Sequence, residues 1–481
     1  MNAKEAKRQC HGHVFGPLSR LGMGLRMNIG ESYVARYRGR LYRFLILLVL
    51  LLSSSTVALA NNATLDASAP AGNGEILSLD RAIALALSNN PEIAATTWEV
   101  TAAEEKLSGA KAARWPIFNA NALYQRNMDD QRLVPARYNG ELGIFDDDIS
   151  SADVTLRIPL YSGGKITSEI KTAELLHLAE KKRLARTREE LVFNVLNTFY
   201  GILGQQAVIR AVEQSIETME SHLKKSKALE KMGKAAPVDV MRTEVRLAEL
   251  GQSLIREKNA LAVAKRLLAN LMGAREAAWS VSGALPMPEP LPGTPESLIA
   301  KSLETRPDYQ AAKERLAAQE HKVDTAKAGN LPAVSLVGSY GGRMAGTTEA
   351  AETGAVGISL SVPLFDGGRV EAQVRQERAL LAAARERLGK LELQIRQDVE
   401  TALLNCDASD RQLEVARHSV MLAEEVLRIE RLKYEMGRGT ALDVLDAQSA
   451  LLQAHTNVVR AMVDSNISRA RLALAMGGQI K

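Results

Sequence analysis

The chain has very little cysteine, and this scarcity excludes a disulfide-stabilised scaffold. Its 481 residues include only Cys10 and Cys406, and Cys10 lies within an N-terminal leader that we expect to be removed. The single remaining thiol cannot form an intrachain disulfide. No cysteine follows the predicted cleavage site directly, so we expect no lipoprotein anchor.

Motifs that carry catalysis or bind metal are missing as well. No Gly-x-Ser-x-Gly nucleophile motif occurs, and no Gly-Lys-Ser/Thr follows either Gly-Gly pair. Five histidines remain beyond the leader, each isolated within a helical pattern and none in a His-x-x-x-His pair: His177, His222, His321, His418 and His455. We therefore expect no catalytic residue, no metal site and no cofactor.

Long apolar runs are confined to the N-terminus. Residues 44–52 are continuously apolar, four arginines precede them between positions 36 and 43, and Ala58-Leu59-Ala60 forms a small-x-small cleavage site. This order is typical of a secretory signal peptide, so residues 1–60 are predicted to be removed, with either Met1 or Met27 as the start. Residues 61–76 are expected to be a flexible segment. No later run reaches the roughly 18 apolar residues of a membrane-spanning helix.

Removal of the leader reverses the sign of the net charge. The whole chain carries +5, and the charged side chains of residues 1–60 account for +7. The mature chain therefore carries about −2, which gives no electrostatic basis for binding nucleic acid. We expect no nucleic-acid partner.

What the chain does contain is one unit that occurs twice. Four landmarks recur at a constant offset of 204 residues, which indicates a gapless duplication. We predict two repeats, residues 77–294 and 295–481. The landmark pairs are Pro159 and Pro363, Met232-Gly233 and Met436-Gly437, Asp239-Val240 and Asp443-Val444, and Met272-Gly273 and Met476-Gly477.

Each repeat contains two segments in which apolar and polar residues alternate. They predict strands near 116–126, 152–161, 332–342 and 355–365, joined by a long acidic loop at 126–151 and a shorter loop at 341–354. A soluble β-sandwich shows the same alternation. Lipid-facing barrel strands are favoured because aromatic residues gather at membrane interfaces. Eight aromatics lie in or beside these segments: Trp115, Phe118, Tyr124, Tyr138, Phe145, Tyr161, Tyr340 and Phe365.

Very long helices follow the strands. Residues 164–232 and 368–436 contain no proline, and at 1.5 Å per residue each run gives roughly 100 Å of helix. Return helices over 239–273 and 443–477 are about half as long and carry a seven-residue apolar repeat typical of coiled coils. Residues 79–114 and 296–330 predict two further half-length helices, so that two halves stacked end to end match one long helix.

A single chain of this kind cannot close a barrel. Four strands are too few, because about eight is the lower limit, and an open sheet edge in lipid leaves backbone groups unpaired. We therefore predict that several chains pool their strands. A trimer with twelve strands is preferred over a dimer with eight, and its long helices form a coiled-coil tunnel.

At the level of motifs, the chain resembles the TolC-like outer-membrane efflux factors. The resemblance covers residues 77–478 and includes an echo of Asn90-Pro91 in Arg306-Pro307. Four motifs carry it: Pro-Leu-Tyr-Ser-Gly-Gly at 159–164, Pro-Leu-Phe-Asp-Gly-Gly at 363–368, Met-Gly-Lys-Ala-Ala-Pro-Val-Asp-Val at 232–240, and Met-Gly-Arg-Gly-Thr-Ala-Leu-Asp-Val-Leu-Asp-Ala at 436–447.

The resemblance implies a trimeric duct for efflux or type I secretion in the outer membrane of a Gram-negative-type cell, with a large periplasmic part. It implies outer-membrane lipid, a periplasmic adaptor (membrane fusion) protein and an inner-membrane pump as partners. It favours no particular cargo, because drugs, metals and polypeptides all use ducts of this shape.

The resemblance also implies a gate at the helix tips. Asp239 and Tyr434 match the family's acidic and tyrosine gate residues. The basic gate residue falls at Gly439, so Arg438 is the nearest cation. The tips that dock the adaptor are Gly233, Lys234, Ala235, Ala236 and Pro237 in the first repeat, and Gly437, Gly439, Thr440, Ala441 and Leu442 in the second.

Two alternatives remain open from the sequence. The tip glycines can serve only to permit positive φ, and Asp239 and Asp443 can serve only to stabilise helix N-termini. A periplasmic coiled-coil scaffold or adaptor would share the long helices but needs no lipid-facing strands.

Overall fold

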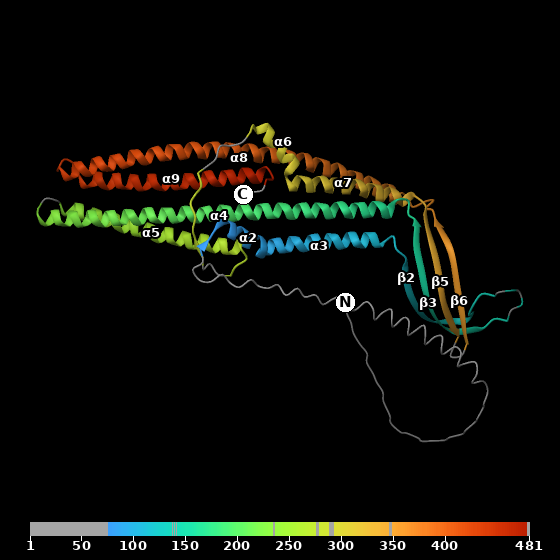
Figure 1. Cartoon of the computed structure of the whole chain (residues 1–481). Coiled ribbons are helices and arrows are strands. Elements are labelled where there is room, and N and C mark those ends of the chain that lie inside the picture. Colours follow the sequence, from blue (N-terminus) through green and yellow to red (C-terminus); the bar gives the residue numbers. More distant parts are fainter. Residues whose placement is uncertain are drawn as a thin grey trace, which may run out of the picture. The chain divides into compact units, whose positions relative to one another are not determined.

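A computed structural model describes residues 76–478 apart from 137, 139, 141, 234–235, 276–278, 288–292 and 346–348 (Figure 1). The expected signal peptide, the choice between Met1 and Met27, the flexible segment up to residue 75, and Lys234 and Ala235 lie outside the described residues. No helix within the described ranges is long and apolar enough to span a membrane.

Four antiparallel strands form one sheet in the order β2-β3-β5-β6 (Figure 1). The strands are β2 (Ile117–Arg132), β3 (Phe145–Tyr161), β5 (Ala333–Ala345) and β6 (Glu349–Ser361). Strand β3 of the first repeat pairs with β5 of the second, with Val154 opposite Tyr340. The sheet therefore joins the two repeats, and β2 and β6 are its edges.

The strands extend further than the alternation of residues indicated. Arg126 pairs with Asp148 and Arg132 with Phe145, while residues 341–345 pair with 349–353. The loops expected at 126–151 and 341–354 are therefore mostly strand, and that expectation was wrong. The period-2 pattern marks only the stretch with one apolar face, whereas the backbone ladder continues through polar residues beyond it.

Two helices of 67 residues leave the sheet, α4 (Lys165–Lys231) and α8 (Arg369–Glu435). Each is preceded by a glycine in the left-handed region, Gly164 with φ 83° and Gly368 with φ 82°. Only glycine adopts this conformation without steric cost, so the second glycine of each Gly-Gly pair sets the turn from strand to helix.

The half-length helices run alongside α4 and α8 (Figure 1). Helices α5 (Pro237–Leu271) and α9 (Ala441–Ala475) return from the turns farthest from the sheet. The half-length helices expected over residues 79–114 and 296–330 are each interrupted, contrary to that expectation. Each is divided by an X-Pro step, because proline begins a helix well but cannot continue one. The pieces are α2 (Leu79–Asn89) and α3 (Pro91–Ala112), and α6 (Pro295–Thr305) and α7 (Pro307–Lys327) with a short 3-10 turn, η1 (Ala328–Asn330).

The largest apolar core lies midway along the long helices. Val195 and Ile202 of α4 are fully buried there against Leu77 and Val281. The last two belong to the short parallel strands β1 (Ile76–Leu77) and β4 (Ser280–Val281). In the second repeat, Val399 and Cys406 of α8 are buried at 0% exposure beside α6 and α9. The helices are therefore anchored at mid-length, between the sheet and the distant turns.

Candidate functional site at the helix tips

The two turns farthest from the sheet, α4–α5 and α8–α9, form the tips. Gly233 and Gly437 adopt φ of 67° and 73° directly after the long helices. Their amides donate to Glu230 and Tyr434 carbonyls at 2.8 and 3.0 Å, and Arg438 N–H donates to the Lys433 carbonyl at 2.8 Å. These are glycine-terminated helix ends, in which a left-handed residue lets the chain reverse.

The two return helices begin differently. In α9 the Thr440 hydroxyl accepts from the Asp443 amide at 3.2 Å, and the Asp443 carboxylate accepts from the Thr440 amide at 3.0 Å. The hydrogen bond from the Thr440 hydroxyl is the main cause that lowers the pKa of Asp443. This reciprocal capping box occupies the carboxylate of Asp443.

Asp239 holds the equivalent position of α5 but lacks the equivalent partner. Its helix is capped by Ala236, whose side chain cannot accept a hydrogen bond. The backbone of Asp239 is engaged, since its amide donates to Ala236 and its carbonyl accepts from Thr243 at 2.8 Å. Within the described part of the chain, the half-buried carboxylate has no hydrogen bond or ion pair. Helix capping therefore accounts for the carboxylate of Asp443 but not for the carboxylate of Asp239.

Tyr434 is half-buried on α8. Its ring packs against a small apolar cluster of Leu427, Val444 and Ala447. On the other side it meets the imidazole of His222 from α4, with ring centroids 5.6 Å apart and a tilt of 52°. Tyr434 is thus the aromatic contact between the tip of one repeat and the tip of the other.

Arg438 is exposed, and in the described residues of one chain its side chain makes no ion pair. At Gly439 an added Cβ would lie 3.1 Å from both Lys433 Cβ and the Tyr434 amide. Close packing within the turn therefore favours glycine at 439. Within one chain, Asp239, Tyr434 and Arg438 are not joined to one another by any hydrogen bond or ion pair among the described residues.

Among the predicted docking residues that the structure describes, Ala441 alone is buried. Ala441 is only 2% exposed because it begins α9 facing the helix pair. Apolar side chains around it are exposed, among them Val238 at 48%, Met241 at 61% and Leu442 at 43%. The docking prediction for Gly233, Ala236, Pro237, Gly437, Gly439 and Thr440 is compatible with their partial or full exposure.

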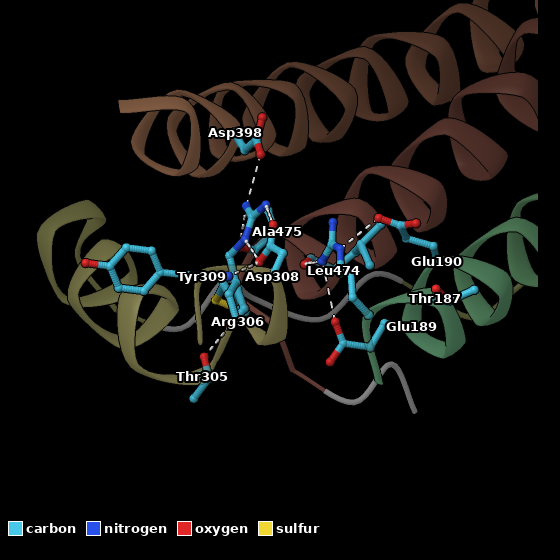
Figure 2. Close-up of polar contacts among 12 residues, drawn as sticks. Thr187, Glu189, Glu190, Thr305, Arg306, Asp308, Tyr309, Asp398, Leu474 and Ala475 are labelled. Atoms are coloured by element: carbon cyan, nitrogen blue, oxygen red, sulfur yellow. Dashed lines mark hydrogen bonds and ion pairs between the residues drawn. The ribbon is translucent and has the colours of Figure 1, made fainter. Parts of the chain in front are cut away.

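A second polar site lies halfway along the helices, where α9 ends against the α6–α7 break. The Arg306 guanidinium, 4% exposed, forms two hydrogen bonds with Asp308 at 2.7 and 3.0 Å and one with Asp398 of α8 at 2.9 Å. It also donates to the carbonyl oxygen of Ala475 at 3.4 Å (Figure 2). Burial acts to raise the pKa of Asp308, but the bonds from Arg306 outweigh it and lower that pKa.

Arg186 adds a contact between the repeats at this level. It lies on α4 and donates to the carbonyl oxygen of Leu474 in α9 at 3.0 Å. It is held by Glu190 at 2.8 Å and by Glu189 at 3.4 Å (Figure 2). Burial raises the pKa of Glu189 against the lowering effect of Arg186.

Sequence reasoning gave no role to this mid-length site. The available signal was the echo of Asn90-Pro91 in Arg306-Pro307. Asn90 does in the first repeat what Arg306 does in the second, because its side-chain amide donates to the carbonyl of Leu271 at the end of α5 at 2.9 Å. Leu271 and Ala475 are 204 residues apart, so the two bonds are repeat partners.

Comparison with known proteins identifies the architecture. The family described as outer membrane efflux protein matches residues 82–274 and 298–478, one segment in each repeat. The chain belongs to this family. Membership confirms the TolC-like fold, with long helices and four antiparallel strands in two repeats. It also confirms an outer-membrane efflux channel rather than an enzyme, and decides against the periplasmic scaffold.

Curated relatives align over most of their length. The outer membrane protein OprJ of Pseudomonas aeruginosa is 27% identical over 421 residues, covering 83% of this chain and 84% of OprJ. The outer membrane protein TolC of Vibrio cholerae is 23% identical over 397 residues, covering 81% of this chain and 88% of TolC.

Solved structures show the same fold. VceC from Vibrio cholerae superposes with a TM-score of 0.70 at 20% identity and covers 83% of this chain and 96% of that one. CusC superposes with a TM-score of 0.73 at 17% identity, over 86% and 96% of the two chains. The family match and the outer-membrane relatives OprJ and TolC place this protein in the outer membrane, with its helical domain in the periplasm.

Proposed function

We propose that the channel is a trimeric, passive exit duct whose periplasmic tips form its gate. The four-stranded sheet of one chain has two open edges, β2 and β6, and unpaired backbone groups in lipid cost several kcal/mol each. Three chains supply twelve strands and remove every edge. The repeats over 77–294 and 295–481 then serve as alternating, similar wall segments around the duct.

The free carboxylate of Asp239 is the observation that carries the gate. The equivalent Asp443 is occupied by its own capping box, whereas Asp239 has no partner within the described part of its chain. A half-buried carboxylate without a partner is costly, so a neighbouring donor is expected in the assembled tip. The Tyr434 hydroxyl and the exposed Arg438 guanidinium are donors close to the second tip turn, and contacts to them across the ring hold the duct closed.

The tips also suit a protein partner. Exposed apolar side chains surround the glycine turns, including Val238, Met241, Met436 and Leu442. Apolar groups gathered at one exposed end mark a contact surface more often than a free one. We assign this surface to a periplasmic adaptor that links the duct to an inner-membrane pump, and adaptor binding relaxes the polar contacts of the gate.

Single-channel conductance in planar bilayers tests the gate. Asp239→Ala combined with Tyr434→Phe is expected to raise conductance several-fold, because both proposed contacts are removed while the helices remain. Asp446→Ala, an exposed carboxylate on α9, is the matched control and is expected to leave conductance unchanged. Unchanged conductance in the double variant would refute this gate.

A further inference from the structure

Apolar packing between the two helix pairs ends before the tip of α4 and α5. The last buried apolar cluster that joins α4 and α5 to α9 consists of Met219, Leu250 and Leu445. Beside it, the described buried cluster of Leu427, Val444 and Ala447 lies within the α8–α9 pair alone. Beyond Met219 the two pairs are therefore held together by something other than apolar burial.

Polar groups replace apolar ones at this level. His222 and Ser226 follow Met219 at helical spacings of three and four residues, on one face of α4. The Nε2 atom of His222 and the hydroxyl of Ser226 are buried without a hydrogen-bond partner. Ser226 is fully buried. Unpaired buried polar groups destabilise a packed seam, so this part of the tip is poised to separate.

His222 makes the central contact of this seam. Its ring packs against Tyr434 of α8 at 5.6 Å, and Tyr434 is one of the proposed gate residues. A direct contact therefore couples the state of the imidazole to the position of the gate tyrosine.

The charges around His222 are positive. Burial is the main cause that lowers its pKa below the ordinary value of 6.5, followed by Arg431 of α8 and Lys225 of its own helix. Three carboxylates near this level pair with lysines, and the second carboxylate oxygen of Glu430 is buried without a hydrogen-bond partner. Glu435 pairs with Lys225 at 3.8 Å, Glu430 of α8 with Lys433 at 2.6 Å, and Glu244 of α5 with Lys227 at 2.7 Å.

We propose that His222 is a proton-operated latch between the two helix pairs of each tip. As a neutral ring it packs between the pairs and holds Tyr434 in the closed arrangement. As a cation the half-buried ring lies beside Arg431 and Lys225, and separation of the pairs brings it into water. Acid therefore favours the open tip. This inference rests on the proposed gate and adds its regulation.

The direction follows from linkage. In the separated state the imidazole is solvated and binds a proton more tightly than in the closed state. Closed-state stability is therefore complete above about pH 6.5 and declines as the pH falls below that value. The ratio of open to closed tips rises by up to about tenfold for each pKa unit by which the two states differ.

Conductance of the full-length trimer between pH 7.5 and 5.0 tests the latch. The unmodified protein is expected to open several-fold more often at the acid end. His222→Gln and His222→Phe cannot take up a proton and are expected to show a flat profile; the phenylalanine keeps a ring against Tyr434. His418→Gln, an exposed histidine on α8, is the matched control and is expected to keep the acid response.

Two results would overturn the latch, an acid response that persists in both His222 variants or no acid response in the unmodified protein. Either result is distinct from failure of the gate, which is judged by the Asp239 and Tyr434 double variant at constant pH. Levels in the outer membrane, measured for every variant, show that each has folded and assembled.

Discussion

Arg306 donates a hydrogen bond to the carbonyl oxygen of Ala475, and this bond fastens the end of α9 to the start of α7. Asn90 fastens the end of α5 to the start of α3 by the same kind of bond to Leu271, at the equivalent place in the first repeat. The last carbonyls of a helix have no partner within it, so a side-chain donor at the next helix satisfies them. These bonds join α9 to α7 and α5 to α3 end to end, so that each pair of half-length helices continues as one long segment.

Loss of the Arg306 side chain should weaken this junction strongly. Arg306→Ala removes the ion pair of the partly buried Asp308 carboxylate and the donor to Ala475, which we expect to cost about 3 kcal/mol. Thermal unfolding of the purified trimer and the rate of limited proteolysis at mid-length would both show it. Arg411→Ala, which removes an exposed i,i+4 pair with Asp407, is expected to cost less than about 0.5 kcal/mol. Equal effects of the two variants would contradict the role given to Arg306.

Two glycines with similar backbone angles should respond differently to alanine. Gly437 at the tip has φ 73° and open space around its Cα, so Gly437→Ala is expected to cost about 1–2 kcal/mol from backbone strain alone. Gly477 has φ 64°, and an added Cβ would lie 2.6 Å from Cα of Arg306. Gly477→Ala must therefore also displace the junction, and its level of assembled trimer should be clearly lower. Equal trimer levels would mean that the junction yields more easily than its packing indicates.

The thiol of Cys406 should be inert while the protein is folded. It is fully buried on α8, and burial raises its pKa to about 11. At pH 8 only about one thiol in a thousand is then ionised, and thiolate is the reactive form. Maleimide labelling should fail on the native trimer and go to completion in denaturant. Rapid labelling of the native protein would show that the α8 core opens.

Much of this architecture could be predicted because two periods dominate the sequence. Proline-free runs after Gly164 and Gly368 predict the long helices, and alternation predicts the strands. The ends of the hairpins could not be predicted, because pairing such as that of Arg132 with Phe145 continues where neither face is consistently apolar. The breaks at Pro91 and Pro307 follow from the missing amide hydrogen of proline, which the total length of each half-helix does not reveal.

Only some residues of the candidate site could be predicted from the sequence, because the others depend on local hydrogen bonds and on helix packing. Motif positions pointed to Asp239 and Tyr434, but the difference between Asp239 and Asp443 depends on whether the preceding cap is Ala236 or Thr440, a local hydrogen-bond question. The contact of His222 with Tyr434 depends on how α4 and α8 approach each other, and no spacing within one helix encodes it. The sequence gives no sign of the role of Arg306, because two of its partners, Asp398 and Ala475, lie far from it along the chain.

We infer that this outer-membrane channel continues through its tips into an inner-membrane assembly. Photo-crosslinking in living cells from position 442 tests this most directly. Leu442 is exposed beside the second tip turn, whereas the neighbouring Ala441 is buried and unsuitable. A probe at Met128, exposed in the β2–β3 hairpin at the other end of the chain, is the matched control. We expect the tip probe alone to capture a periplasmic protein tethered to the inner membrane, identified by mass spectrometry. Repeated absence of such a product, with the trimer intact in the outer membrane, would contradict it.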